Sequence, residues 1–161
     1  MKKNKLIIVM GVSGSGKSTI AKGIAKSLDL PFYDADDFHP KENIAKMESG
    51  EPLNDIDRKP WLEKINAFSA DIVKSTALVF ACSALKESYR EILSRNINVV
   101  FVYLKGSPKL IHDRMNARED HFMPLNLLDS QFKDLEEPLH AITIDIDQSK
   151  EAIINEAISQ I

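Results

Sequence analysis

The chain has 161 residues, of which 43% are hydrophobic and 28% are charged, so it is long enough to bury the core of one globular domain. Its 24 acidic and 21 basic side chains leave a net charge of −3, which argues against a general affinity for nucleic acid or anionic membranes. A single cysteine, Cys82, excludes an internal disulfide and is compatible with a cytoplasmic location. No apolar stretch approaches the length of a membrane span.

Strand-like and helix-like segments alternate from one end of the chain to the other. Apolar or β-branched runs predict strands at residues 5–10, 31–33, 76–81, 99–104 and 141–146. Helical spacing predicts helices at residues 16–28, 40–50, 57–68, 86–95, 107–117, 125–135 and from 149 onward. In the third helix, Asp57 is the expected N-cap and Pro60 is expected in the first turn. Such alternation predicts parallel strands joined by crossover helices, and therefore one three-layer α/β domain over residues 1–161.

The clearest functional motif is the run Gly11-Val12-Ser13-Gly14-Ser15-Gly16-Lys17-Ser18, which matches the phosphate-loop pattern. A buried strand is expected before it and an amphipathic helix after it, which is the context that the motif requires. Glycines let the backbone curl so that its N–H groups point at a phosphate, and the helix N-terminus favours negative charge. We therefore expect residues 11–18 and Thr19 to bind ATP, with Lys17 at the β- and γ-phosphates and Ser18 as an oxygen ligand of Mg²⁺.

Carboxylates follow the second predicted strand, at Asp34, Asp36 and Asp37. Ligands of open α/β sheets bind beyond the carboxyl ends of the strands, so these side chains are expected near the phosphate loop. Asp34 is a candidate to hold Mg²⁺ through water, and Asp36 a candidate to accept the proton of an attacking hydroxyl. Asp37 is interpreted as a surface residue. The third strand ends in Cys82 without the metal-binding Asp typical of switch and motor proteins.

Two arginines, Arg114 and Arg118, stand four residues apart at the end of a predicted helix. This spacing places both guanidinium groups on one helical face, next to an irregular segment. We expect residues 114–126 to form a small lid whose arginines stabilise the phosphoryl group during transfer. The alternative is a solvated helix end whose positive charges favour the helix dipole.

Several longer motifs accompany the phosphate loop. They are Asp34-x-Asp36-x-x-His39-Pro40, Asn43-Ile44-x-Lys46-Met47-x-Ser49-Gly50, Pro52-Leu53-Asn54-Asp55-x-Asp57-Arg58-x-Pro60-Trp61-Leu62, Cys82-Ser83-Ala84-Leu85-Lys86-x-x-Tyr89-Arg90, Tyr103-Leu104-Lys105-Gly106, Arg118-x-x-His121-Phe122-Met123 and Ser130-Gln131-Phe132-x-x-Leu135-Glu136-x-Pro138. Together with the phosphate loop, these segments resemble the gluconate kinase family. The resemblance spans residues 6 to about 147, and the segments at 52–62 and 82–90 are far more specific than the phosphate loop. Ala35 and Asp120 stand where glycines are common, and the second change could reshape the lid.

The resemblance implies a kinase that transfers the γ-phosphoryl group of ATP, with Mg²⁺, to the 6-hydroxyl of D-gluconate. It also implies a five-stranded parallel sheet like that of shikimate and nucleoside-monophosphate kinases, and a possible homodimer. The expected catalytic groups are Lys17, Asp36 and Arg118, with Arg114 closing over the nucleotide.

The substrate region is expected within residues 34–90. The gluconate carboxylate needs a cation, for which Arg58 and Arg90 are candidates and Lys86 is in reserve. Arg58 has an alternative structural role, pairing with Asp55 or Asp57 in its own helix. His39 and His121 are candidates to bind substrate hydroxyls, although a histidine before Pro40 can also serve only to fix a loop.

Two rival functions stay open at this point. One is another kinase of the same fold, acting on shikimate or a nucleotide. The other is a nucleotide-dependent binding module that transfers no phosphate. A purely binding module has no need of an acid such as Asp36 that orients a hydroxyl, which favours a kinase.

Overall fold

A five-stranded parallel sheet forms the centre of the computed structural model, which describes residues 4–117 and 125–161. Its strands are β1 (Leu6–Met10), β2 (Phe32–Asp34), β3 (Leu78–Ala81), β4 (Val99–Lys105) and β5 (Ile142–Asp145). They lie in the order β2-β3-β1-β4-β5, and all four strand pairs are parallel. The predicted α/β class with five parallel strands is confirmed.

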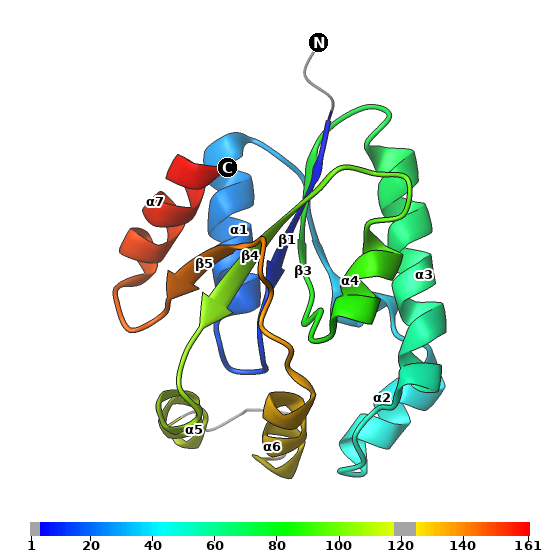
Figure 1. Ribbon diagram of the computed structural model, residues 1–161, viewed down its shortest axis with the longest axis vertical. Coiled ribbons are helices and arrows are strands. Elements are labelled where there is room, and N and C mark those ends of the chain that lie inside the picture. The colour runs from blue at the N-terminus through cyan, green and yellow to red at the C-terminus, as the bar shows by residue number, and fades with distance from the viewer. Residues whose placement is uncertain (1–3, 118–124) are drawn as a thin grey trace.

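Helices cover both faces of the sheet, as the predicted crossovers require. They are α1 (Lys17–Leu28), α2 (Lys41–Glu48), α3 (Asp55–Ile72), α4 (Glu87–Leu93), α5 (Pro108–Asn116), α6 (Leu125–Asp134) and α7 (Lys150–Gln160), with a 3₁₀ turn η1 (Ala35–Phe38). Helices α1 and α7 lie on one face and α3 and α4 on the other (Figure 1). Helices α2, α5 and α6 lie beyond the carboxyl ends of the strands (Figure 1). None of the described helices is both long enough and apolar enough to cross a membrane.

The core is built around the two most apolar strands. Every residue of β1 and β3 is buried, because each strand has a neighbour on both sides and helices on both faces. Phe80 of β3 lies in an aromatic cluster with Tyr33, Phe38 and Phe68, which joins β2, η1 and α3 to the sheet. The loops that follow β1, β2 and β3 therefore start from rigid positions.

Helix α3 begins earlier than the sequence predicted. Its N-cap is Asn54, whose side chain accepts a hydrogen bond of 2.8 Å from the Asp57 N–H. The Asp57 carboxylate in turn accepts a bond of 2.9 Å from the Asn54 N–H, which completes a reciprocal capping box. The prediction of Asp57 as N-cap was wrong, since this pair moves the helix start back to Asp55 and leaves Pro60 inside the helix.

Candidate active site

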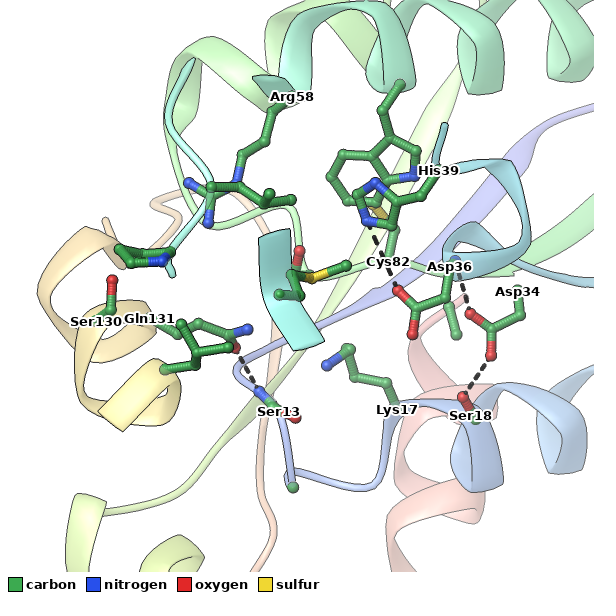
Figure 2. A pocket seen from close by; sticks show the side chains of 18 of the residues that line it. Ser13, Lys17, Ser18, Asp34, Asp36, His39, Arg58, Cys82, Ser130 and Gln131 are labelled. Carbon is green, nitrogen blue, oxygen red and sulfur yellow. Dashed lines mark hydrogen bonds and ion pairs between the residues drawn. The ribbon is translucent and has the colours of Figure 1, made fainter. Parts of the chain in front are cut away.

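A cavity of about 300 Å³ opens at the carboxyl ends of β1, β2 and β3. The phosphate loop forms its floor, η1 and the following loop one side, α3 its roof and α6 the opposite side (Figure 2). The sheet order places these segments together, because β1 and β2 both neighbour β3. Most of the residues that the sequence singled out for nucleotide and substrate binding line this cavity.

The phosphate loop follows β1 and leads directly into α1. Gly14 and Gly16 have positive φ angles of 83° and 94°, a region that residues with a Cβ rarely occupy. A Cβ at Gly14 would also lie 2.8 Å from Cγ of Met115, so both backbone shape and space require glycine there. Lys17 bends over the loop and donates from Nζ to the Val12 carbonyl at 3.1 Å. Burial lowers the pKa of Lys17, and the carboxylates of Asp36 and Asp34 oppose that shift.

The two candidate metal ligands are in direct contact. Ser18 Oγ donates to Asp34 Oδ2 at 3.0 Å, and the other oxygen of Asp34 accepts from the Asp36 N–H at 2.9 Å. Within residues 4–117 and 125–161, no three His, Cys, Asp or Glu side chains cluster as a metal site would require. A hydroxyl and a carboxylate nevertheless fit Mg²⁺, which takes hard oxygen ligands and completes its shell with phosphate and water.

Asp36 faces the same space as Lys17, from η1 on the side of the cavity (Figure 2). The Asp36 side chain is 65% exposed, so a ligand that enters the cavity can reach the carboxylate. Desolvation raises the pKa of Asp36, Lys17 lowers it, and the charges of Asp34 and Asp37 raise it. The geometry therefore brings together a carboxylate and an ammonium group, the pair predicted to act on the hydroxyl and the phosphoryl group.

His39 lies against Trp61, with ring centroids 4.0 Å apart and an angle of 17° between the planes. Trp61 is fixed in turn by a hydrogen bond of 2.7 Å from its Nε1 to the Ala35 carbonyl. His39 Nε2 lies 4.0 Å from Asp36 Oδ1, and the histidine side chain is only 3% exposed. Burial, assisted by the positive charge of Arg58, lowers the pKa of His39 to about 4, so the ring is neutral near pH 7.

Arg58 is the predicted carboxylate-binding cation that the fold brings to the cavity (Figure 2). It is 7% exposed, and its Nη1 donates to Tyr89 Oη at 2.8 Å and to Asp134 Oδ2 at 3.1 Å. Its ion-pair partner is thus Asp134 of α6, rather than the alternatives predicted in its own helix. Those two carboxylates, Asp55 and Asp57, bond to lysines instead.

The other two predicted carboxylate ligands do not line the cavity. Arg90 is 4% exposed and donates to the carbonyls of Ala84 at 2.7 Å and Glu136 at 2.9 Å, and to the Glu87 carboxylate. These bonds join the start of α4 to the segment after α6, which is a structural role. Lys86 donates to Asp55 at 3.1 Å.

The residues of the predicted lid fall into two groups. Arg114 donates from Nη2 to the Ile146 carbonyl at 2.8 Å, so it lies at the end of β5 and outside the cavity lining. Arg118, Asp120 and His121 lie outside the described residues. The lid itself therefore stays a prediction.

Helix α6 contributes two contacts that sequence reasoning missed. Gln131 Oε1 accepts a bond of 2.7 Å from the Ser13 N–H of the phosphate loop, and Asp134 holds Arg58. These two residues are three apart, so they share one face of the helix. The sequence marked Gln131 as part of a matching motif but offered no role, because its partner is 118 residues away. This face of α6 links the phosphate-loop side of the cavity to the side where Arg58 lies.

Comparisons with known proteins agree with this geometry. The family model described as shikimate kinase matches residues 13–161. A probable gluconokinase of Dictyostelium discoideum is 48% identical, over 96% of this chain and 86% of that protein. The thermoresistant gluconokinase of Escherichia coli is 44% identical, over 97% of this chain and 93% of that protein. The crystal structure of a gluconokinase from Sinorhizobium meliloti superposes with a TM-score of 0.88 at 41% identity, covering 99% of this chain and 92% of that one.

Proposed function

This chain belongs to the shikimate-kinase family of P-loop kinases and, within it, to the gluconokinases, and on that premise we propose that it phosphorylates D-gluconate with ATP. The products are 6-phospho-D-gluconate and ADP. One observation carries the proposal: Lys17, Asp36 and Arg58 face one cavity, which offers a site for a phosphoryl group, a hydroxyl and a carboxylate. The two rival functions are not favoured, because the relatives that match nearly the whole chain are a probable gluconokinase and a gluconokinase.

The nucleotide would lie on the phosphate loop, with its phosphates on the backbone N–H groups of residues 12–18 other than Ser13, whose N–H donates to Gln131. Ser18 and Asp34 would hold Mg²⁺, which, when bound, neutralises charge on the β- and γ-phosphates. Lys17 would leave the Val12 carbonyl and follow the γ-phosphoryl group as it moves. Its lowered pKa reflects a burial cost that a phosphate partner would offset.

Gluconate would lie between η1 and α3, where its two ends meet opposite charges. Arg58 would bind the carboxylate with the part of its guanidinium fork that Tyr89 and Asp134 leave available. Asp36 would accept a hydrogen bond from the 6-hydroxyl and take its proton late in a loose transition state. His39 would bind a hydroxyl near the reacting one.

An acceptor panel with coupled detection of ADP tests the proposed reaction. Purified protein with Mg-ATP should release ADP with gluconate, and far more slowly with shikimate or AMP. Preference for shikimate or AMP would assign the chain a different acceptor, and release without any acceptor dependence would remove the kinase assignment. Arg58→Met should raise the KM for gluconate by about 10- to 100-fold, the effect of one lost charged hydrogen bond, and leave the KM for ATP nearly unchanged.

Location and assembly complete the proposal. We place the enzyme in the cytoplasm, where ATP is available as donor, and we include the homodimer that the family resemblance implies. The mass of the purified protein in solution, measured by light scattering after size-exclusion chromatography, decides between monomer and dimer.

A further inference from the structure

The most informative side chain outside the proposed reacting groups is Asn43, on α2. It is only 4% exposed, and it lies where α2, α3 and the loop carrying His39 meet. Its Nδ2 donates to the backbone carbonyl of Asp57 at 2.9 Å. The same nitrogen lies 3.2 Å from Nδ1 of His39.

These two contacts indicate which nitrogen of His39 carries the proton. A backbone carbonyl can only accept, so the amide nitrogen of Asn43, and not its oxygen, must face Asp57. The amide nitrogen is a donor with two hydrogens, so the second one points to His39 Nδ1, which must accept. A neutral histidine that accepts at Nδ1 carries its hydrogen on Nε2.

We propose that Asn43 is a positioning residue that fixes His39 in the Nε2–H tautomer, so that this N–H faces Asp36 and a hydroxyl of the acceptor. The stacking of the ring on Trp61 holds its plane, and the Nε2 atom lies 4.0 Å from Asp36 Oδ1. That nitrogen and that oxygen form a donor and acceptor pair at the edge of the cavity.

Such a pair suits the chemistry of a polyol, and this step rests on the proposed function. A hydroxyl is both donor and acceptor, and a carboxylate can satisfy only its hydrogen. With Nε2–H beside it, Asp36 can take the hydrogen of a hydroxyl while His39 donates to an oxygen lone pair. The opposite tautomer would turn a lone pair toward the carboxylate, so the ring would offer no donor there for the oxygen of the hydroxyl.

The charged groups around the ring are consistent with a neutral histidine. Asp34 favours the protonated ring, whereas Arg58 and burial oppose it. Asp36 lies on the Nε2 side and the neutral Asn43 on the Nδ1 side. No acid lies against Nδ1 among the described contacts of His39, so the amide donor at Nδ1 and the carboxylate on the Nε2 side favour the same tautomer.

The first test is spectroscopic and needs no activity. Nitrogen-15 NMR of histidine-labelled protein at neutral pH, without substrate, reports the protonation of each ring nitrogen, and His39→Gln assigns the signal. We expect a protonated Nε2 and an unprotonated Nδ1. A proton on Nδ1 overturns the proposal, whatever reaction the protein catalyses.

The second test uses a pair of matched variants. Asn43→Leu removes the donor, and Asn66→Leu is the control, because Asn66 Nδ2 also donates to two acceptors, the carbonyls of Leu93 at 3.0 Å and Arg95 at 3.1 Å. Only Asn43→Leu should populate the Nδ1–H tautomer and raise the KM for gluconate about tenfold, the effect of one lost hydrogen bond, with the KM for ATP unchanged. Equal kinetics in the two variants, or an unaltered tautomer in Asn43→Leu, contradicts the proposal.

Should Asn43→Leu not fold, the ring itself can be replaced. His39→Gln places an amide nitrogen near the position of Nε2, and His39→Asn places one near Nδ1. We expect kcat/KM for gluconate to be about tenfold higher in His39→Gln than in His39→Asn. Equal or inverted values refute the assignment of the donor to Nε2.

Discussion

His39 should make the protein lose stability on mild acidification. Its side chain is 3% exposed and its pKa is lowered from 6.5 to about 4. The folded protein therefore binds fewer protons at this ring than the unfolded chain does between these two values. Stability from the neutral ring is present above pH 6.5 and is lost as the pH falls through this window.

The size of the loss follows from the two pKa values. Their difference of 2.5 corresponds to about 3 kcal/mol in the limit below pH 4, at about 1.4 kcal/mol for each pH unit. At about pH 5 the same relation gives about 2 kcal/mol. This pH is chosen because carboxylates such as Asp55 and Asp57, whose pKa values hydrogen bonds lower, titrate below it.

Urea unfolding at about pH 7.5 and about pH 5 measures the effect, with His39→Gln as the comparison. The wild type should lose about 2 kcal/mol more than the variant between the two conditions. Because each protein is compared with itself, a general destabilisation by the substitution cancels. Equal losses in the two proteins would refute a buried neutral histidine at this position.

Three further predictions concern the cavity walls. Gly14→Ala should lower the free energy of unfolding, measured in urea, by about 1–3 kcal/mol and should weaken ATP binding, because the φ of 83° and the nearby Met115 leave no place for a methyl group. An unchanged free energy of unfolding would contradict this. Gln131→Ala should weaken Mg-ATP binding by about tenfold in calorimetry, since the Ser13 N–H loses its acceptor and the loop its support from α6; unchanged affinity would limit that contact to packing. Burial raises the pKa of Cys82 to about 12, so a thiol reagent at about pH 8 should label it only after denaturation, and rapid labelling of native protein would be the contrary result.

The parts of the site that sequence reasoning predicted are those encoded locally. The phosphate loop is a contiguous motif between a strand and a helix, and its residues need no distant partner to be recognised. The proximity of Ser18 and Asp34, the candidate metal ligands, was predicted because the carboxyl ends of parallel strands meet at one edge of the sheet.

The choice among Arg58, Lys86 and Arg90 shows where local reasoning fails. All three are cations in matching motifs, and nothing nearby in the sequence distinguishes them. What separates Arg90 from the cavity is a bond to the carbonyl of Glu136, 46 residues further along the chain. What holds Arg58 at the cavity is Asp134, 76 residues away. Such contacts depend on tertiary packing that composition and spacing do not encode.

The start of α3 was predicted wrongly for a different reason. The pair Asn54 and Asp57 has the spacing of a capping box, with a shorter acid in place of the usual glutamate. The signal was therefore present in the sequence, and placing the cap on Asp57 overlooked its partner three residues earlier.

The role of Asp36 is tested most directly by comparing Asp36→Asn with Asp37→Asn, its neighbour in η1, which does not line the cavity. Turnover of gluconate should fall severely in Asp36→Asn while the affinity for Mg-ATP stays within a fewfold, and Asp37→Asn should behave like the wild type. Substantial gluconate turnover by Asp36→Asn would contradict the assignment of Asp36 as the group that orients and deprotonates the acceptor hydroxyl.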